Sequence, residues 1–348
     1  MKIAIITSGK VGSPKVLSSC LHASLKEQGI QADLFNRIDV FKRLVDPSQL
    51  GQKYHPALWS IYRLCFLLPD WLFIRKLNSY DAIIIVETSP YGFLRHSYNF
   101  AKLRQKLRNT PLLYYGVYYL GNAPTMVKYL KENNHYSIDL FDWHLAVCEV
   151  TEIRQKPQAP WSQIGLHLKS TDLRPDPKEG LLGLVDFARP GFEEMRDAQI
   201  QVLKKLKIPY VALEGKYSIE EIREIYRKAT FYFMQSGESF GVPLAECLSC
   251  GCYIFTPDSS WPMAWRLDQQ PQIHGPGTLA DCFVLYRNKT DLEEKLRRLA
   301  ETYDLENTPK QVFDFFSSQY PYYYESNKKA MQEVLDKIRN REIGHRNN

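Results

Sequence analysis

The sequence lacks long apolar runs and an export signal. No stretch of its 348 residues reaches the length of about 18 apolar residues that a membrane-spanning helix needs. The opening residues, MKIAIITSGKVGS, carry too little positive charge and too short an apolar run for a signal peptide. We therefore expect a cytoplasmic protein, and the apolar run predicts a first strand instead.

Cysteine is scarce, with seven residues, an odd number. This count argues against a disulfide framework and agrees with a reducing compartment. Three of the cysteines, Cys247, Cys250 and Cys252, cluster in the sequence, but no fourth Cys or His lies nearby. Because a structural zinc site takes four ligands, we expect no metal here. Small side chains buried at a helix–strand junction are the better interpretation.

Positive charge is concentrated in the first half of the chain. The net charge is +6, and residues 1–160 carry 20 Lys and Arg against 12 Asp and Glu. Residues 161–348 carry 25 against 27 and are slightly acidic. A basic first half suits an acidic acceptor or an anionic membrane surface, although ordinary surface charge would give the same count.

Short apolar runs alternate with helical patterns along the whole chain. In the first half, strands are predicted over 2–7, 30–35, 81–86, 112–115 and 143–148. One helix is predicted to end near residue 28, and two more are predicted over 96–106 and 126–132. In the second half, strands are predicted over 180–187, 210–213, 231–235 and 252–256, with helices over 193–207, 219–228, 242–249 and 323–339. This alternation is typical of parallel sheets with crossover helices. A polar segment with two prolines, 155–160, is interpreted as a linker.

The most informative segment is 235–251, with the sequence QSGESFGVPLAECLSCG. A short strand ends in a Gly-containing loop, Pro243 stands in the first turn of a helix, and Gly251 ends that helix. Glu238 precedes the helix, and Glu246 lies about one turn inside it. The amides at the helix start would point out from the carboxyl edge of a sheet, which favours an anion.

Residues 238–251 resemble the donor-site signature of the retaining GT-B glycosyltransferases, above all family 4. The usual pattern is E-G-F-G-x-P-x-x-E-A-x-A-C-G, and here it stands as ESFGVPLAECLSCG, with Ser239 in place of the first Gly. The upstream segments 214–216 and 219–229 are also similar to the run that precedes this motif in the family. The similarity covers about 210–260 and is weaker over 180–209, and in the first half of the chain only the general layout matches.

The resemblance implies an α/β GT-B fold, in which two Rossmann-like domains face each other across a deep cleft. The first domain, 1–157, would bind the acceptor, and the second, 160–318, would bind the donor. A C-terminal helix, about 320–340, would cross back onto the first domain. The donor would be a nucleotide diphosphate sugar, and neither a cofactor nor a metal would be needed.

The same resemblance suggests roles for the two glutamates. Glu246 would accept hydrogen bonds from the ribose hydroxyls, and Glu238 would bind hydroxyls of the transferred sugar. A carboxylate suits both roles because it accepts from two vicinal hydroxyls at once. The backbone around the helix start would support the sugar and the phosphates, through Ser239, Phe240, Gly241 and Val242.

A diphosphate leaving group calls for positive charge, which fixed donors would provide in the transition state. The family carries an Arg and a Lys after the first strand of the second domain. Here Arg189 follows that strand, but the next candidate is Arg196 and not a Lys five residues further on, so the spacing departs from the pattern. We assign the diphosphate to Arg189, with Arg196 or Lys216 as its companion. Each of these residues could instead be a solvated surface charge.

In the first domain the turn that holds Gly9 and Gly12 resembles the family's Gly-rich loop, which faces the donor phosphates and the acceptor. It could equally be a plain tight turn, because it is not G-x-G-x-x-G and lacks the ending of a phosphate-loop NTPase. Family members often carry a His near the sugar, and His96 is the candidate here, whereas His144 lies inside a strand and is interpreted as structural. Contacts to the acceptor are assigned to Tyr91, Tyr115 and Tyr118.

Aromatic and basic residues mix in segment 53–77, KYHPALWSIYRLCFLLPDWLFIRKL. This mixture fits a helix in the membrane interface, which would serve a lipid-linked acceptor at the inner face of the cell membrane. Aromatic residues at helical spacing also occur in protein cores, so both interpretations stay open. Single-stranded nucleic acid is not expected, because no recognised module accompanies the segment.

Together these features predict a retaining hexosyltransferase that moves a sugar from a UDP- or GDP-linked donor to a glycan or lipid-linked acceptor. Its catalytic residues would be Glu238, Arg189, Lys216 and His96. Two alternatives stay open: a nucleotide-sugar 2-epimerase of the same fold, and a non-catalytic subunit that binds sugar nucleotides. A nicotinamide dehydrogenase is disfavoured, because the first βα turn lacks the glycine fingerprint and the second strand does not end in an acidic residue.

Overall fold

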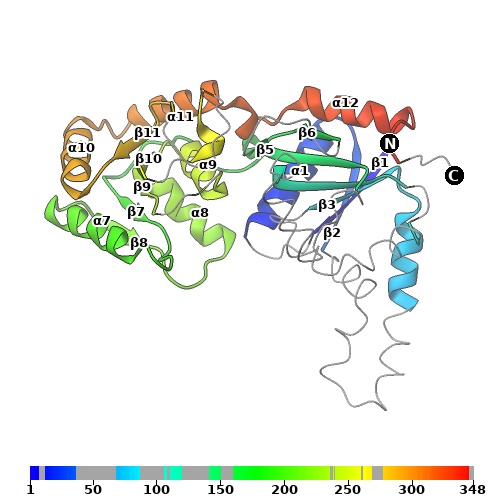
Figure 1. The fold of residues 1–348 in the computed structure, drawn as a ribbon, viewed down its shortest axis with the longest axis horizontal. Coiled ribbons are helices and arrows are strands. Elements are labelled where there is room, and N and C mark those ends of the chain that lie inside the picture. Colours follow the sequence, from blue (N-terminus) through cyan, green and yellow to red (C-terminus); the bar gives the residue numbers. More distant parts are fainter. Residues whose placement is uncertain are drawn as a thin grey trace, which may run out of the picture. The chain divides into compact units, whose positions relative to one another are not determined.

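The chain forms two compact units. The structure is a computed structural model, and it describes residues 1–7, 12–36, 68–86, 106–107, 110–119, 141–149, 160–235, 238, 240–259, 262–268 and 277–344. Unit 1 consists of residues 1–166 and 327–348, and unit 2 of residues 167–326. The described strands form one sheet in each unit (Figure 1).

Unit 1 is built on a parallel sheet whose described strands follow the order β2-β1-β3-β4-β5-β6. The strands are β1 (Lys2–Thr7), β2 (Gln31–Phe35), β3 (Ala82–Val86), β4 (Leu112–Tyr119), β5 (Trp143–Glu149) and β6 (Trp161–Gln163). Helix α1 (Ser13–Glu27) connects β1 to β2, and α12 (Lys328–Arg339) returns to this unit and contacts β6. Residues 68–77 are also helical. Consecutive apolar residues in the central strands are buried, as expected where helices cover both faces of a sheet.

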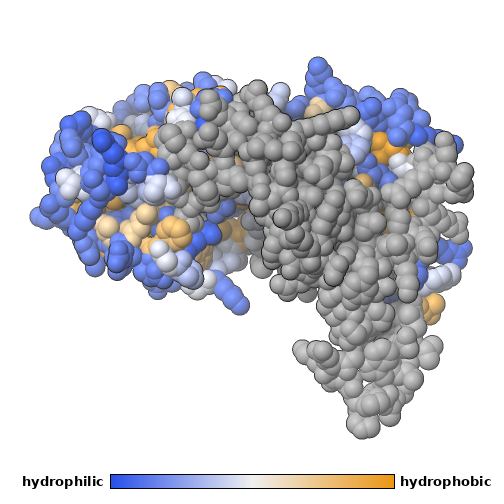
Figure 2. All heavy atoms as spheres, in the orientation of Figure 1, coloured by the Kyte–Doolittle hydropathy of each residue, from blue (hydrophilic) through white to orange (hydrophobic). Residues whose placement is uncertain are grey.

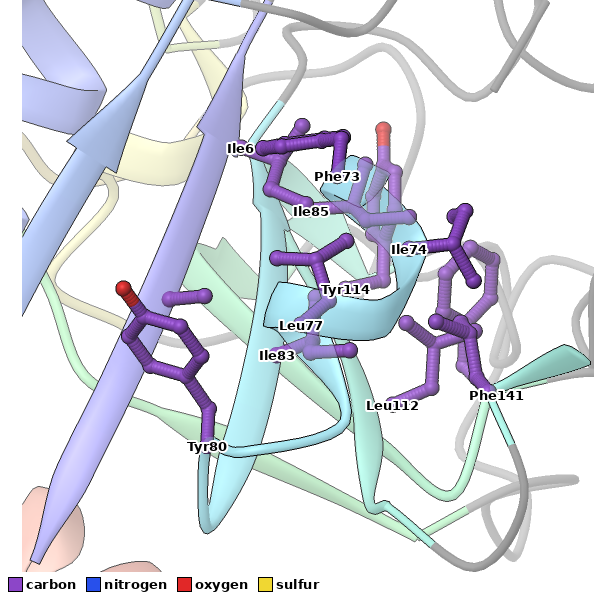
Figure 3. Packing of buried hydrophobic residues seen from close by; sticks show 12 residues of the cluster. Ile6, Phe73, Ile74, Leu77, Tyr80, Ile83, Ile85, Leu112, Tyr114 and Phe141 are labelled. Atoms are coloured by element: carbon purple, nitrogen blue, oxygen red, sulfur yellow. The ribbon is translucent and has the colours of Figure 1, made fainter. Parts of the chain in front are cut away.

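One face of the unit 1 sheet packs against the helical residues 68–77. Phe73, Ile74 and Leu77 point from this helix toward Ile83 and Ile85 of β3 (Figure 3). The other members of this cluster, all buried, are Ala4, Ile6, Tyr80, Leu107, Leu112, Tyr114 and Phe141. This packing assigns one face of the helix to the protein core.

Unit 2 repeats the same architecture with five parallel strands in the order β11-β10-β9-β7-β8. The strands are β7 (Gly183–Val185), β8 (Tyr210–Ala212), β9 (Phe231–Phe233), β10 (Tyr253–Pro257) and β11 (Phe283–Tyr286). The helices are α7 (Glu193–Lys205), α8 (Ile219–Lys228), α9 (Val242–Ser249), α10 (Lys289–Thr302) and α11 (Thr308–Gln319). Hydrophilic side chains predominate on the visible face around α7 and α10 (Figure 2).

The strand order of unit 2 reverses direction between β7 and β9. The chain runs from β7 outward to β8 and then returns to β9 on the other side of β7. In open α/β sheets such a reversal opens a crevice outside the carboxyl ends of the two strands, where ligands bind. The topology therefore marks the carboxyl ends of β7 and β9 as the place to look for a site.

Local sequence signals explain where the helices of unit 2 begin and end. Ser218 and Glu221 form a reciprocal capping box at the start of α8. Lys178 is buried, and its ammonium donates to the carbonyl oxygens of Arg227, at 2.6 Å, and Cys250, at 2.7 Å. This one side chain thus satisfies carbonyls at the C-terminal ends of both α8 and α9.

Candidate functional site

Charged side chains meet at the carboxyl ends of β7 and β9. The backbone N–H of Asp186, directly after β7, donates to the carbonyl of Phe233 at the end of β9, at 3.2 Å. Arg189 follows three residues later, and Glu238 follows β9. The fold therefore brings two carboxylates and one guanidinium to the point where the strand order reverses.

Arg189 contacts both carboxylates through one nitrogen. Its Nη2 donates to Oε2 of Glu238 at 3.1 Å and lies 3.7 Å from Oδ2 of Asp186. The Asp186 side chain is only 10% exposed, whereas those of Glu238 and Arg189 are 28% and 45% exposed. The three residues carry a net charge of one negative unit when all are ionised, and Arg189 is the member most open to solvent.

Burial affects the ionisation of both carboxyl groups. Loss of solvation raises the pKa of Asp186, and the nearby Arg189 opposes this rise. Loss of solvation likewise raises the pKa of Glu238, with Arg189 lowering it and the negative charge of Asp186 raising it further. Two carboxylates that compete for one cation thus hold protons more readily than exposed acids do.

The backbone that carries Asp186 is held by two side chains. Gln235 Nε2 donates to the Asp186 carbonyl at 2.7 Å, and Arg196 Nε donates to the same oxygen at 3.2 Å. Arg196 also donates to the carbonyl of Leu213 at 3.3 Å and lies 3.6 Å from Glu214. The Arg196 guanidinium therefore ties β7 to the segment after β8.

The start of α9 stands beside Glu238. Gly241 is the N-cap residue, with a φ of 65°, in the left-handed region that glycine tolerates best. A Cβ on Gly241 would lie 2.7 Å from Cγ of Glu238 and 2.9 Å from Cγ of Leu244. The close approach of Glu238 to this helix start therefore requires glycine at position 241.

An aromatic cluster anchors the loop that links Glu238 to α9. Phe240 is buried and stacks on Trp265 at a centroid distance of 5.3 Å, and Trp265 Nε1 donates to the Phe240 carbonyl at 2.6 Å. The Tyr323 ring meets Phe240 edge-on at 4.8 Å. Phe240 therefore fixes the backbone of the loop and does not present its ring to a ligand.

Glu246 lies inside α9 and is paired with Arg223 of α8. Arg223 Nε and Nη2 both contact Oε1 of Glu246, at 2.9 Å and 2.8 Å. The Glu246 side chain is 6% exposed and the Arg223 side chain is 15% exposed, so this is a buried ion pair. Burial raises the pKa of the Glu246 carboxyl, and Arg223 opposes the rise. Both guanidinium contacts go to one oxygen, and among the described residues no hydrogen bond involves Oε2.

The remaining predicted residues of unit 2 are Lys216, Val242 and Ser239. Lys216 is exposed, and Val242 is buried in the first turn of α9. Ser239 lies outside the described residues. The structure thus brings Glu238 and Arg189 together beside Gly241, whereas Glu246 forms its ion pair with Arg223 of α8.

In unit 1, three of the six predicted site residues lie outside the described part of the chain. These are Gly9, Tyr91 and His96. Gly12 is the N-cap residue of α1, with a φ of 71°. Tyr115 is buried inside β4, which continues to Tyr119, and its hydroxyl donates to the carbonyl of Gly165 at 2.7 Å. Tyr118 is half-buried in the same strand.

Three residues at this site were not foreseen from the sequence. Asp186 could have been noticed, because an acidic residue directly follows the apolar run of β7. Arg223 carries no signal of its own among the charged residues of α8. Trp265 lies 25 residues beyond Phe240, and only the fold brings the two rings together.

Of segment 53–77, only residues 68–77 are described. Leu68, Trp71 and Leu72 are exposed on this helix, opposite the core-facing residues, and the Arg75 guanidinium lies 5.6 Å from the centre of the Trp71 ring. In the described parts of the chain, no helix combines the length and the apolar character needed to cross a membrane. Within those parts there is also no cluster of three His, Cys, Asp or Glu side chains that could hold a metal ion.

Comparison with known proteins gives structural matches only. No protein-family model matches the chain, and no match is found among curated protein sequences. Trehalose-6-phosphate synthase OtsA aligns with a TM-score of 0.53 and 10% identity, covering 97% of this chain and 99% of that chain. A protein described as UDP-N-acetylglucosamine 2-epimerase, from Listeria monocytogenes, aligns with a TM-score of 0.53 and 13% identity, covering 98% and 96%.

A UDP-forming trehalose-phosphate synthase from Burkholderia xenovorans aligns with a TM-score of 0.50 and 9% identity, covering 97% of this chain and 98% of that chain. Likeness at such low identity concerns the fold. The chain has the α/β fold of two Rossmann-like domains that defines the GT-B type, as predicted.

Proposed function

We propose that the protein is a metal-independent glycosyltransferase that moves a hexose-type sugar from a UDP- or GDP-linked donor to a glycan or lipid-linked acceptor, with retention of anomeric configuration. One observation carries the proposal: Glu238 and Arg189 meet at the strand reversal of unit 2, beside the N-terminus of α9. This is where a Rossmann-like sheet binds a nucleotide. Retention rests on the resemblance of 238–251 to the family 4 signature.

In this proposal the donor lies along the carboxyl edge of the unit 2 sheet. The amides at the start of α9 would face the diphosphate, where the helix dipole favours negative charge. Arg189, the most exposed of the three charged residues, would donate to a phosphate oxygen. Glu238 would accept from the sugar hydroxyls, and Oε2 of Glu246 would accept from the ribose.

The contribution of the protein to the reaction would be positioning and charge stabilisation. As the bond from the anomeric carbon to the diphosphate oxygen breaks, negative charge grows on the leaving group. Arg189 and the helix amides would stabilise this charge, with Lys216 as a further cation in the same unit. Removing one such fixed donor typically costs on the order of 100-fold in kcat.

Unit 1 would bind the acceptor in this proposal. Its basic composition favours an anionic acceptor or an acceptor at a membrane of anionic lipids. The exposed residues Leu68, Trp71 and Leu72, with Arg75 beside them, have the chemistry of an interfacial contact. A cytoplasmic enzyme that docks on the inner face of the membrane would combine these features.

A nucleotide-binding screen tests the donor site. UDP, GDP, ADP and their sugar conjugates are added to the full chain, and thermal unfolding is recorded. One base should raise the Tm by on the order of 5 °C at about 100 times its Kd. Glu246→Gln should abolish this shift, whereas Glu224→Gln, an exposed acid on α8, should retain it. If no nucleotide shifts the wild-type Tm at millimolar concentration, the proposal is wrong.

The same incubations separate a transferase from a 2-epimerase, the activity named for one structural neighbour. A nucleotide sugar is incubated with the protein alone and then with candidate acceptors, and the products are followed by NMR. A transferase should release the nucleoside diphosphate in proportion to the acceptor consumed. A new nucleotide sugar formed without acceptor would favour the epimerase.

A further inference from the structure

The charge balance at Arg189 conflicts with simple diphosphate binding. One guanidinium nitrogen serves both Asp186 and Glu238, at 3.7 Å and 3.1 Å. A nucleotide sugar adds at least two negative charges beside these carboxylates. Other N–H groups of the Arg189 guanidinium can still donate to a phosphate, but the added negative charge would then lie close to two partly buried carboxylates that share one cation, which is unfavourable.

The other groups around Asp186 do not supply the missing charge. Arg196 of α7 directs Nε to the Asp186 carbonyl and lies 3.6 Å from Glu214. Tyr232 of β9 donates its hydroxyl to the Asp186 carboxylate, and Tyr226 of α8 is buried nearby. Both tyrosines have pKa values raised by burial and stay neutral.

Around Glu238 the charged groups are Arg189 and Asp186, and α9 presents Gly241 and the apolar Leu244. Gln235, which holds the Asp186 backbone, carries no charge. Among the described residues, the two carboxyl groups thus have one cation between them. Protonation of one carboxyl would reduce the negative charge beside an incoming diphosphate and so add to the stabilisation by Arg189 and the amides of α9.

We propose that Asp186 is a further residue of the donor site and that nucleotide-sugar binding takes up one proton, which comes from solvent and is held on the Asp186 or Glu238 carboxyl while the Arg189 guanidinium donates to the phosphate. This inference rests on the proposed function, because it needs a diphosphate ligand. The direction of the pKa changes agrees with it, since burial raises the pKa of both groups. Asp186 acts here as a positioning residue that controls the charge around Arg189.

Isothermal titration calorimetry of the wild-type chain measures the proton directly. The probe is UDP-glucose or GDP-mannose, whichever the screen finds bound, because an intact nucleotide sugar does not itself titrate near neutral pH. Titrations in PIPES and in imidazole at the same pH should give different heats, since the two buffers release protons with different enthalpies. The apparent Kd should rise with pH between about 6 and 8, by up to tenfold per pH unit for one proton.

Asp186→Asn keeps the shape of the side chain and removes its charge. In this variant the heats in the two buffers should agree, the slope of Kd against pH should flatten, and binding at about pH 8 should be roughly tenfold tighter than in the wild type. The matched control, Glu224→Gln, should keep the wild-type slope.

Equal heats in the two buffers and a flat Kd for the wild-type chain would overturn the inference while leaving the proposed function intact. This outcome needs no variant, so it decides the question even if Asp186→Asn does not fold. An unchanged slope in a folded Asp186→Asn would also overturn the inference. Absence of nucleotide-sugar binding at every pH would instead remove the proposed function, and the inference with it.

Discussion

At the scale of single residues, Arg223 and Glu246 form a buried ion pair in unit 2. Removing two charges from water costs several kcal/mol per ion, and mutual attraction recovers this only with good geometry. Well-packed apolar residues would be as stable or more stable at such positions. Stability alone therefore does not account for the pair, and the ribose-binding role proposed for Glu246 would give a reason to keep it ionised.

Arg223→Met should leave Glu246 buried without its cation and lower the free energy of unfolding of unit 2 by about 3–5 kcal/mol at neutral pH. The loss should shrink toward about pH 5, because a carboxyl whose folded pKa is raised favours the folded state only when protonated. Urea unfolding, with hydrogen exchange of peptides from β9 and α9 as the readout, measures the loss in unfolding free energy at neutral pH and near pH 5. Lys228→Met, which breaks only an exposed pair with Glu224, should change stability by less than about 0.5 kcal/mol. An equally small change in Arg223→Met would contradict the buried-charge argument.

At the scale of elements, the loop before α9 depends on distant aromatic rings. Trp265 of the short helix η5 (Met263–Trp265) contacts Phe240, Tyr320 and Tyr323, and the two tyrosines belong to the segment just before the chain returns to unit 1. The position of Glu238 is thus set by packing between η5 and the end of unit 2, beyond the motif itself.

Trp265→Phe keeps an aromatic ring in this cluster and removes the N–H that holds the Phe240 carbonyl. Loss of this bond should weaken nucleotide-sugar binding about fivefold, corresponding to about 1 kcal/mol. Phe316→Leu, in the same cluster, should lower stability by about 1 kcal/mol and leave the Kd nearly unchanged. Calorimetric titration and urea unfolding of both variants distinguish anchoring of the loop from general destabilisation. Equal Kd values for the two variants would refute the anchoring role.

The elements that the sequence predicted best are those with a strong local pattern. The predicted ranges 219–228 and 242–249 agree with α8 and α9, because a capping box and a Pro–Gly frame mark their ends. The strand predicted over 180–187 is only Gly183–Val185, and the helix predicted over 323–339 begins at Lys328. Composition alone does not reveal that Ser326, with a φ of 61°, breaks the helical pattern.

The site was predictable in part for the same reason. Glu238 and Glu246 stand in one local motif, and Arg189 follows a strand that periodicity had located. Asp186 directly follows the apolar run of β7 and could have been noticed. Arg223 acts through Glu246, a partner 23 residues away in sequence, so no local pattern reports it. Elements β6, β11, α10 and α11 were not predicted.

At the scale of the whole molecule, the chain passes between the units at two neighbouring places. The N–H of Lys169 donates to the Tyr324 carbonyl at 3.0 Å, and the N–H of Asn327 donates to the Ile164 carbonyl at 2.7 Å. Lys169 also pairs with Glu325 at 2.7 Å. The outgoing and returning segments are thus bonded to each other, and the three residues whose side chains are proposed to hold the donor, Arg189, Glu238 and Glu246, lie in unit 2.

A fragment of residues 167–326 should therefore fold and bind the donor nucleotide with a Kd within about tenfold of the full chain. Its sheet, its core and the Asp186, Arg189 and Glu238 cluster are complete within this range. Circular dichroism and calorimetric titration check folding and affinity. A folded fragment that does not bind would mean that unit 1 contributes directly to the donor site.

The return of α12 to unit 1 has a consequence for the order of events on the ribosome. Unit 1 is begun by the first 166 residues but receives α12 only after all of unit 2 has been translated. The later unit can reach its native state while the earlier one still waits for its last helix. A premature stop codon shortly before residue 328 would leave unit 2 complete and deprive unit 1, the unit that was made first, of its last helix.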